Sequence, residues 1–164
     1  MSNLFMNTKL GILEIICSDQ ELLEINIVLQ KSMEKPNKIC LETEKQIKEY
    51  LNKERRTFNL PIKLTGSEFQ KTVWNELINI SYGTTISYLN LATKIGNPKG
   101  VRAVANAVGA NKLLIIVPCH RVIGSNNTLT GFGGGLNNKI ELLNLENIKV
   151  LKNRDLKKSK IIKV

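Results

Sequence analysis

The chain has 164 residues, and its 42% hydrophobic and 23% charged content is that of an ordinary globular protein. This composition excludes global disorder, and the length allows one or two small domains. No apolar run approaches the roughly 20 residues of a transmembrane helix, and the N-terminus lacks the pattern of a signal peptide. We therefore expect a cytoplasmic protein that does not bind membranes.

The net charge of +10 is concentrated toward the C-terminal end. Residues 1–64 carry ten basic and nine acidic side chains, residues 65–146 seven and four, and residues 147–164 seven and one. A basic protein favours a polyanionic partner, above all nucleic acid. A solvated tail explains the charge of the last segment equally well, so the charge alone leaves both interpretations open.

The cysteines do not indicate disulfides or a metal site. Cys17, Cys40 and Cys119 are widely spaced and odd in number, which favours reduced thiols. The single histidine, His120, and the absence of a CxxC pair argue against zinc. We therefore expect no metal site.

Residues 1–64 have the pattern of a small α/β domain. Gly11–Ser18 and Glu21–Leu29 are rich in isoleucine and predict two strands joined by a short turn. A charged amphipathic helix is expected at about 41–53, and residues 58–64 are expected to be extended. A domain of this size is marginal for an independent core, so we expect it to pack on the rest of the chain.

From Ser67 the pattern becomes helical. Ser67 and Gln70 form a capping box ahead of an apolar repeat that ends near Ile80. Ser87 is suited to cap a second helix at about 88–95, and a third is expected at about 100–110. Three short helices with a glycine-containing turn between the last two predict a helix-turn-helix. The remaining elements are expected to be strands at 113–117 and 121–123, a hairpin turn at 124–127 and a helix at 136–145.

The third helix is expected to present a lightly charged outer face. Its residues are Arg102, Ala103, Asn106, Ala107 and Ala110, with one cation and no acid. Such small side chains allow a close approach to a phosphate-lined groove. An ordinary surface helix with few charges is the alternative.

Cys119 lies in the run IIVPCHRVI, directly before His120. The thiolate is the reactive form of cysteine, and a neighbouring imidazole or cation favours it, so Cys119 is the candidate nucleophile and His120 the candidate base. The alternative is a buried cysteine beside a satisfied histidine. Consecutive residues of a strand point to opposite faces, so this pairing needs a turn at 118–120 or a bridging water. Glu146 is a candidate for orienting the imidazole.

These residues together resemble a known family. Asn111 and the PCHRV run at 118–122 are similar to the active-site signature of the O6-alkylguanine-DNA alkyltransferases. Further segments resemble the family in order and spacing: FQKTVW at 69–74, YGTTISY at 82–88, GNP at 96–98, RAV at 102–104 and GGGL at 133–136. The resemblance is strong over about 67–146 and only general over 1–64.

The resemblance implies an α/β protein with a ribonuclease H-like domain at 1–64, a winged helix-turn-helix domain at 65–146 that carries the active-site cysteine, and a basic tail at 147–164. It implies direct repair of double-stranded DNA that contains O6-alkylguanine. Cys119 would take the alkyl group once and irreversibly, without a cofactor, after the damaged nucleotide is flipped out. A monomer is expected, and O4-alkylthymine as a further substrate is left open.

The resemblance also implies roles for the catalytic residues. His120 would remove the thiol proton through a water, Glu146 would orient the imidazole, and Asn111 would tie the segment before Cys119 to the helix-turn-helix. Tyr88 would donate a proton to guanine N3 and neutralise the charge on the leaving base. Half-buried packing is the alternative for Tyr88.

Other residues would contact the DNA or line the base pocket. Arg102 resembles the arginine that fills the gap left by the flipped nucleotide, and a solvated charge is its alternative. Gly133 N–H would donate to guanine O6, and the carbonyls of Cys119 and Val122 would accept from the exocyclic amine. The remaining DNA-contact residues are Ser87, Ala103 and Asn106, and the remaining pocket residues are Val108, Phe132 and Gly134.

Three residues depart from the family pattern. Lys112 stands where many members have proline, Phe132 lacks a hydroxyl that some members carry, and Gly133 replaces serine or alanine. These changes affect the breadth of the pocket rather than the reaction. Two other functions are the alternatives: a non-catalytic damage sensor, which would not need a thiol at 119, and a cysteine hydrolase, which would need an oxyanion hole that the sequence does not indicate.

Overall fold

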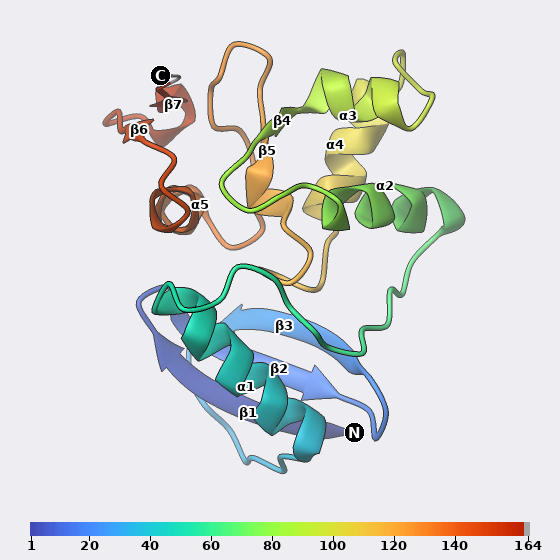
Figure 1. Ribbon diagram of the computed structural model, residues 1–164, viewed down its shortest axis with the longest axis vertical. Coiled ribbons are helices and arrows are strands. Elements are labelled where there is room, and N and C mark those ends of the chain that lie inside the picture. The colour runs from blue at the N-terminus through green and yellow to red at the C-terminus, as the bar shows by residue number, and fades with distance from the viewer. Residues whose placement is uncertain (163–164) are drawn as a thin grey trace. The chain divides into compact units, whose positions relative to one another are not determined.

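The computed structural model describes residues 1–162 and divides the chain into two compact units (Figure 1). The first unit comprises Met1–Thr65 and Lys112–Leu114, and the second comprises Gly66–Asn111 and Ile115–Val164. The first is a mixed α/β unit and the second is largely helical, which confirms the predicted fold class. None of the helices within residues 1–162 combines the length and the apolar character needed to cross a membrane.

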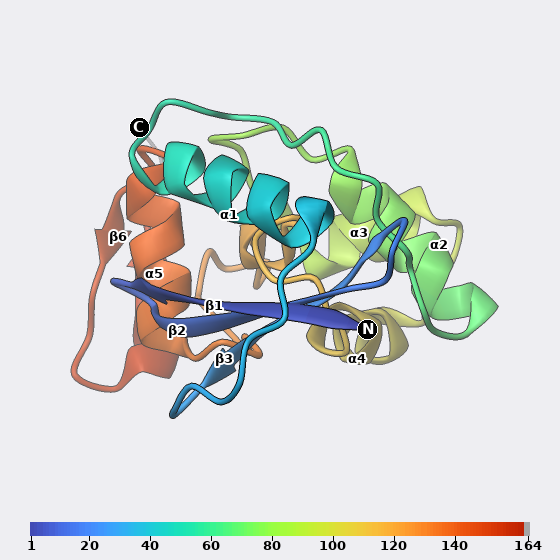
Figure 2. The same ribbon diagram turned by 90° about the horizontal axis from the view of Figure 1, so that it is seen from below.

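The first unit is a three-stranded antiparallel sheet covered by one helix. Its elements are β1 (Ser2–Thr8), β2 (Gly11–Cys17), β3 (Leu22–Val28) and α1 (Lys38–Leu51), and the strand order is β1-β2-β3. Figure 2 shows α1 crossing one face of this sheet. The first strand was not predicted, because Asn3 and Asn7 break its short apolar run. It forms because β1 pairs with β2 along its whole length, from Ser2 opposite Cys17 to Thr8 opposite Gly11.

The α1 helix begins earlier than the sequence pattern indicated. Asn37 caps it, because its side-chain oxygen accepts the Cys40 N–H at 2.9 Å. Ile47 and Tyr50 are fully buried in the core of this unit. The segment 58–64 is extended as expected, and it bonds to β3 through Leu22, whose N–H donates to the Pro61 carbonyl at 2.7 Å.

The second unit is built on three helices, α2 (Glu68–Ile78), α3 (Tyr88–Lys94) and α4 (Val101–Gly109). The capping box of Ser67 and Gln70 is present, and Ser87 caps α3 by accepting the Asn90 N–H at 3.0 Å. The Trp74 indole N–H donates to the Ala107 carbonyl at 2.8 Å and joins α2 to α4. Ala107 is therefore buried, and its predicted place on the outer face of the helix was wrong.

The run 113–117 is not a strand. Leu114, Ile115 and Ile116 form a turn, and Ile115 has a φ of 75°, in the left-handed region. Five successive apolar residues carry no period that separates a strand from a turn inside the core, and all five are buried here. The chain then forms η1 (Cys119–Arg121) and β5 (Val122–Ile123), which pairs in parallel with β4 (Ile86–Ser87).

The C-terminal residues are folded up to residue 162. After α5 (Leu136–Leu145) come β6 (Val150–Leu151), η2 (Leu156–Lys158) and β7 (Lys160–Ile161), in the segment that the charge pattern set apart as a basic tail. Ile161 belongs to a core cluster with Ile123 and Leu143. Ile148, Val150 and Leu156 pack against the same cluster, together with Leu136. The last two residues of that segment, 163 and 164, lie outside the described part.

Candidate active site and DNA-binding surface

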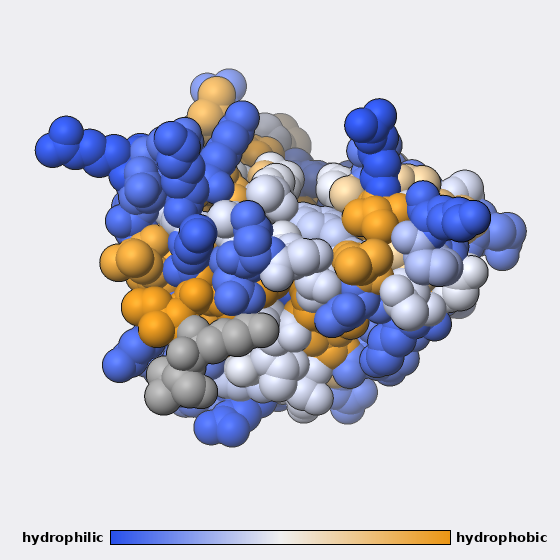
Figure 3. Space-filling model, turned by 90° about the horizontal axis from the view of Figure 1, so that it is seen from above, coloured by the Kyte–Doolittle hydropathy of each residue, from blue (hydrophilic) through white to orange (hydrophobic). Residues whose placement is uncertain are grey.

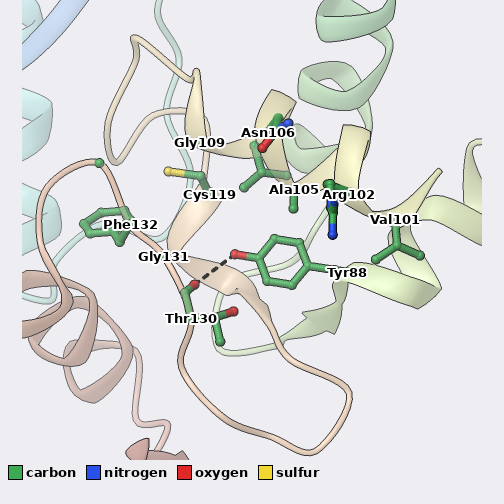
Figure 4. Close-up of a pocket in the computed structure, with 12 residues that line it drawn as sticks. Tyr88, Val101, Arg102, Ala105, Asn106, Gly109, Cys119, Thr130, Gly131 and Phe132 are labelled. Atoms are coloured by element: carbon green, nitrogen blue, oxygen red, sulfur yellow. Dashed lines mark hydrogen bonds between the residues drawn. The ribbon is translucent and has the colours of Figure 1, made fainter. Parts of the chain in front are cut away.

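Cys119 lies beside a cavity of about 580 Å³ in the second unit. Figure 4 places it between the side chains of α4 and Phe132. After Pro118 the chain turns into η1, so it is not a regular strand around the cysteine. A turn at this point is what a pairing of Cys119 with His120 needs. The cavity is lined by Tyr88, Val101, Arg102, Ala105, Asn106, Val108, Gly109, Cys119, Thr130, Gly131, Phe132 and Gly133.

Most of the predicted pocket residues lie in this lining, and two do not. Val122 is fully buried in β5, and Gly134 accepts the Asn138 side-chain N–H at 2.8 Å through its carbonyl; neither lines the cavity. Thr130 and Gly131 also line the cavity and were not predicted, because neither belongs to the glycine triplet at 133–135.

Asn111 joins the cysteine to the chain before it. Its side-chain amide donates to the Val117 carbonyl at 2.9 Å and to Cys119 Sγ at 3.2 Å. Burial raises the pKa of the Cys119 thiol, and the Asn111 hydrogen bond and the positive charge of Lys139 act in the opposite direction. The position of Asn111 therefore favours the thiolate over the thiol.

His120, Arg121 and Glu146 form a buried network. His120 Nε2 lies 2.9 Å from Glu146 Oε1, and Arg121 donates to the same oxygen from Nη2 at 2.7 Å. The Gly83 N–H donates to the other carboxylate oxygen at 3.2 Å. Burial alone would raise the pKa of Glu146, but the hydrogen bonds from His120 and Arg121 outweigh it and lower the pKa to about 2. Glu146 is therefore ionised throughout the neutral range.

The ionised carboxylate determines which nitrogen of His120 carries the proton. A carboxylate only accepts hydrogen bonds, so Nε2 must be the protonated nitrogen and Nδ1 keeps its lone pair. Burial lowers the pKa of His120 more than Glu146 raises it, so the ring is neutral at pH 7. Nδ1 is buried and has no hydrogen-bond partner within residues 1–162. This is the arrangement of a base that is ready to take a proton.

Arg121 belongs to the PCHRV run, but the sequence predicted no function for it. It is buried, and its Nη1 donates to the Ile80 carbonyl at 2.5 Å, while its guanidinium lies 5.8 Å from the centroid of the Tyr82 ring. Arg121 thus joins the Glu146 carboxylate to the chain that leads from α2 to α3.

Lys139 was not predicted from the sequence. It extends from α5, is fully buried, and donates from Nζ to the carbonyls of Val122 (2.6 Å), Thr130 (3.1 Å) and Gly131 (3.3 Å). Burial lowers its pKa to about 8. The sequence feature that could have indicated this buried lysine is the position of a cation on the apolar face of the last helix, three residues after Leu136.

Tyr88 is at the first turn of α3 and faces the cavity. Its hydroxyl donates to the Thr130 carbonyl at 3.0 Å, the dashed line in Figure 4. Burial raises the pKa of Tyr88, so its hydroxyl keeps its proton in the neutral range. A phenol that faces the cavity and keeps its proton is suited to donate it.

The candidate DNA contacts on α4 are exposed. Arg102, Ala103 and Asn106 all face solvent, and Arg102 and Asn106 also line the cavity. Ser87 differs, because its hydroxyl is used to cap α3. A helix with small exposed side chains and one arginine beside a cavity has the features of a surface that approaches DNA closely.

The fold and site define a protein with a buried cysteine that lines a cavity beside a helix-turn-helix, and the comparisons with known proteins agree. The model of the 6-O-methylguanine DNA methyltransferase ribonuclease-like domain matches residues 3–64, and that of its DNA binding domain matches residues 68–148. The chain belongs to the family of methylated-DNA–protein-cysteine methyltransferases.

Individual relatives cover the chain to different extents. A probable methylated-DNA–protein-cysteine methyltransferase of Acanthamoeba polyphaga mimivirus is 42% identical over 143 residues, which are 86% of this chain and 93% of the relative. The inducible one of Bacillus subtilis (strain 168) is 50% identical over 101 residues, 62% of this chain, and the match spans 56% of its length. The solved structure of Mycobacterium tuberculosis OGT in complex with DNA has a TM-score of 0.80 and 38% identity, and covers 87% of this chain and 90% of its own.

Proposed function

We propose that this chain repairs double-stranded DNA by moving the alkyl group of O6-alkylguanine to its own Cys119. The observation that carries the proposal is a cysteine beside a cavity of about 580 Å³ whose lining also holds an exposed arginine and a tyrosine hydroxyl. A cavity of this size accommodates a flipped base. Membership of the family supports the reaction, and the solved complex of the Mycobacterium tuberculosis relative supports DNA as the partner.

The first step is the activation of the thiol. His120 Nδ1 takes the Cys119 proton through a bridging water, and the resulting imidazolium is stabilised by Glu146. The Asn111 amide donates to the sulfur, and the buried Lys139 ammonium lowers the energy of its negative charge. Each group stabilises the thiolate more than the thiol, as activation requires.

The second step is alkyl transfer. The thiolate attacks the alkyl carbon, a C–S bond forms, and the C–O6 bond breaks with its electron pair remaining on the guanine. Tyr88 delivers a proton to N3, and the Gly133 N–H donates to O6, so the leaving base does not carry an isolated negative charge. The products are guanine and S-alkylcysteine. A thioether is not hydrolysed under mild conditions, so each molecule acts once.

DNA binding places the damaged nucleotide in the cavity. Arg102 fills the space that the flipped nucleotide leaves, and Ala103 and Asn106 allow α4 to lie close to the groove. The carbonyl of Cys119, a residue that lines the cavity, accepts a hydrogen bond from the exocyclic amine. The Val122 carbonyl accepts from the buried Lys139 ammonium instead.

The acting species is a monomer that works in the cytoplasm without a membrane partner. One chain supplies the nucleophile, the base and the proton donor, and a thiol that must stay reduced suits that compartment. The proton that His120 takes from the thiol is released to solvent, and the proton that Tyr88 gives to guanine is replaced from solvent. Protons and electrons therefore balance, and the transfer requires no cofactor.

The intact mass of the protein tests the proposal, measured before and after mixing with a duplex that holds one O6-methylguanine. We expect a gain of one methylene mass that saturates at one equivalent and maps to the peptide with Cys119, not to those with Cys17 or Cys40. The control is Cys119→Ser, which should bind the duplex without gaining mass. An unchanged mass with tight binding to the damaged duplex would point to a damage sensor, and an unchanged mass without binding would refute the proposal.

A further inference from the structure

The segment 147–162 displays a dense group of cations. Its exposed basic residues, defined here as the C-terminal cationic patch, are Lys149, Lys152, Arg154, Lys157, Lys158 and Lys160. The one acid of the segment is Asp155, whose carboxylate accepts the Lys157 backbone N–H at 3.2 Å at the start of η2. The charge of the patch is therefore strongly positive.

The backbone that carries this patch is ordered. Ser159 is fully buried, and its hydroxyl accepts the Asn153 N–H at 2.9 Å. Ile161 is part of the core, and β6 pairs with β7 in antiparallel register, Val150 opposite Ile161. Cations on an ordered backbone lose less entropy on binding than those of a disordered tail, so a fixed phosphate surface is favoured over a merely solvated one.

The same segment is bonded to the loop that leads into the cavity. The Leu129 N–H donates to the Ser159 carbonyl at 2.9 Å, and the Ile161 N–H donates to the Asn127 carbonyl at 3.0 Å. Thr128 forms a bridge with Lys160. Two residues after Thr128 the chain reaches Thr130, which lines the cavity. The patch is thus an extension of the loop that lines the cavity.

The space-filling view shows hydrophilic side chains gathered at separate places on the second unit, with pale and apolar side chains between them (Figure 3). Figure 3 looks down on the end of this unit that carries the turn between α3 and α4 and the C-terminal segment, and hydrophilic side chains gather over both. Lys99, in that turn, is exposed as well. A duplex whose damaged base enters the cavity continues past it on both sides.

We propose that the C-terminal cationic patch binds the DNA phosphate backbone on one side of the damaged nucleotide, and so extends the contact surface beyond the helix-turn-helix. The inference rests on the proposed function. The patch lies past residue 148, where the match to the DNA binding domain model ends, so that domain match does not include it. Because phosphates carry no sequence information, the patch adds affinity and salt dependence, not sequence preference.

Deletion of the segment is not a clean test. It would remove Ile148, Val150, Leu156 and Ile161 from a shared core and unfold part of the unit. Point substitutions avoid this, because the patch side chains are exposed. The test variant is Lys152→Gln, Lys157→Gln, Lys158→Gln and Lys160→Gln combined. The matched control, with the same change in charge, is Lys31→Gln, Lys35→Gln, Lys38→Gln and Lys45→Gln, all exposed in the first unit.

The measurement is the affinity for an undamaged duplex at several salt concentrations. Each phosphate contact contributes about 0.9 to the slope of log K against log salt, so loss of two to four contacts lowers the slope by roughly 2–4. The control should keep the wild-type slope, and so should a variant with arginine at the four test positions. A wild-type slope in the glutamine variant, or an equal loss in the control, would overturn the inference.

Asymmetric duplexes locate the contact. Both proteins carry Cys119→Ser, which prevents reaction. Shortening the DNA on one side of an O6-methylguanine should weaken binding by the protein with the native patch and leave binding by the glutamine variant unchanged. Shortening the DNA on the other side should weaken binding by both equally. Equal responses to both cuts would contradict a one-sided contact. Methyl transfer from the O6-methylguanine duplex to the unsubstituted Cys119 separates the two proposals. If Cys119 is methylated while the slope is unchanged, only the patch inference fails; if Cys119 stays unmodified, the proposed function fails.

Discussion

Tyr88 and Lys139 donate hydrogen bonds to the same acceptor, the carbonyl oxygen of Thr130, at 3.0 and 3.1 Å. The Lys139 Nζ also lies 6.0 Å from the centroid of the Tyr88 ring. A carbonyl that already accepts from an ammonium group is a weaker acceptor for a phenol. Lys139 therefore weakens the hydrogen bond between the Tyr88 hydroxyl and Thr130, which is what the proposed role of Tyr88 as a proton donor requires.

Tyr88→Phe should slow alkyl transfer by about 100-fold, because it removes the proton donor and keeps the ring. Binding to undamaged duplex should stay within twofold of wild type, since the hydroxyl bonds to the protein itself. Single-turnover rates on a duplex with O6-methylguanine measure the effect.

The matched control is Tyr82→Phe. The Tyr82 hydroxyl donates to the Leu145 carbonyl at 3.1 Å, so its loss should cost about 1 kcal/mol of stability and leave the transfer rate near wild type. Equal rates in the two variants would contradict a donor role for Tyr88.

Lys139→Met should slow transfer by roughly tenfold or more, because the thiolate loses a buried positive charge. It should also change how stability depends on pH. The pKa of Lys139 is about 8 in the folded state and 10.5 when unfolded, so between these values the unfolded state binds more protons and wild-type stability rises with pH.

The difference in unfolding free energy between wild type and Lys139→Met should therefore increase by roughly 3 kcal/mol from pH 8 to 10.5. Denaturant titrations at both pH values measure it. Lys139→Arg keeps a charge at every pH and should lack the rise. Stability curves for wild type and Lys139→Met that run parallel over this range would show that the lysine is not charged and buried as described.

Glu146→Gln should slow transfer by about 100-fold or more, because a neutral amide no longer fixes the tautomer of His120, and it leaves the Arg121 charge without its partner. That buried charge should also reduce stability by about 3–5 kcal/mol. Glu141→Gln, an exposed change on the same helix, is the control and should do neither.

The effect of Glu146 on stability depends on pH in a defined direction. Its pKa is about 2 in the folded state and 4.5 when unfolded, so its contribution is fully present above pH 4.5 and is lost as the pH falls toward 2. The gap in unfolding free energy between wild type and Glu146→Gln should close by about 3 kcal/mol across that window. A gap that does not depend on pH would disprove the ionised network.

Arg102→Ala should slow repair of a duplex far more than reaction with free O6-benzylguanine, by about tenfold or more. The reason is that the guanidinium acts on the flipped nucleotide and not on the reacting atoms. Lys99→Ala removes an exposed cation next to the same helix; it should slow duplex repair only weakly and leave the reaction with free O6-benzylguanine unchanged. Equal slowing of both reactions by Arg102→Ala would show that this residue does not act in flipping.

The sequence by itself determined the local elements and the reactive segment. Ser67 and Ser87 were identified as caps because their partners lie three residues away, and hydrogen bonds at that range depend little on the rest of the fold. The PCHRV run is contiguous, so its thiol and imidazole could be read directly. The spacing of apolar residues likewise predicted α2, α4 and α5, and the Ser87 cap predicted α3.

Only the tertiary structure decided the contacts between distant residues. Lys139 lies 20 positions after Cys119, and nothing in its spacing shows that it would donate to three carbonyls beside the cavity. The turn at Ile115 and the folding of residues 147–162 also depend on burial against non-neighbouring side chains. Local hydrogen bonds and periodicity are written in short stretches of sequence, whereas a buried charge or an apolar turn becomes favourable only once the surrounding core has formed.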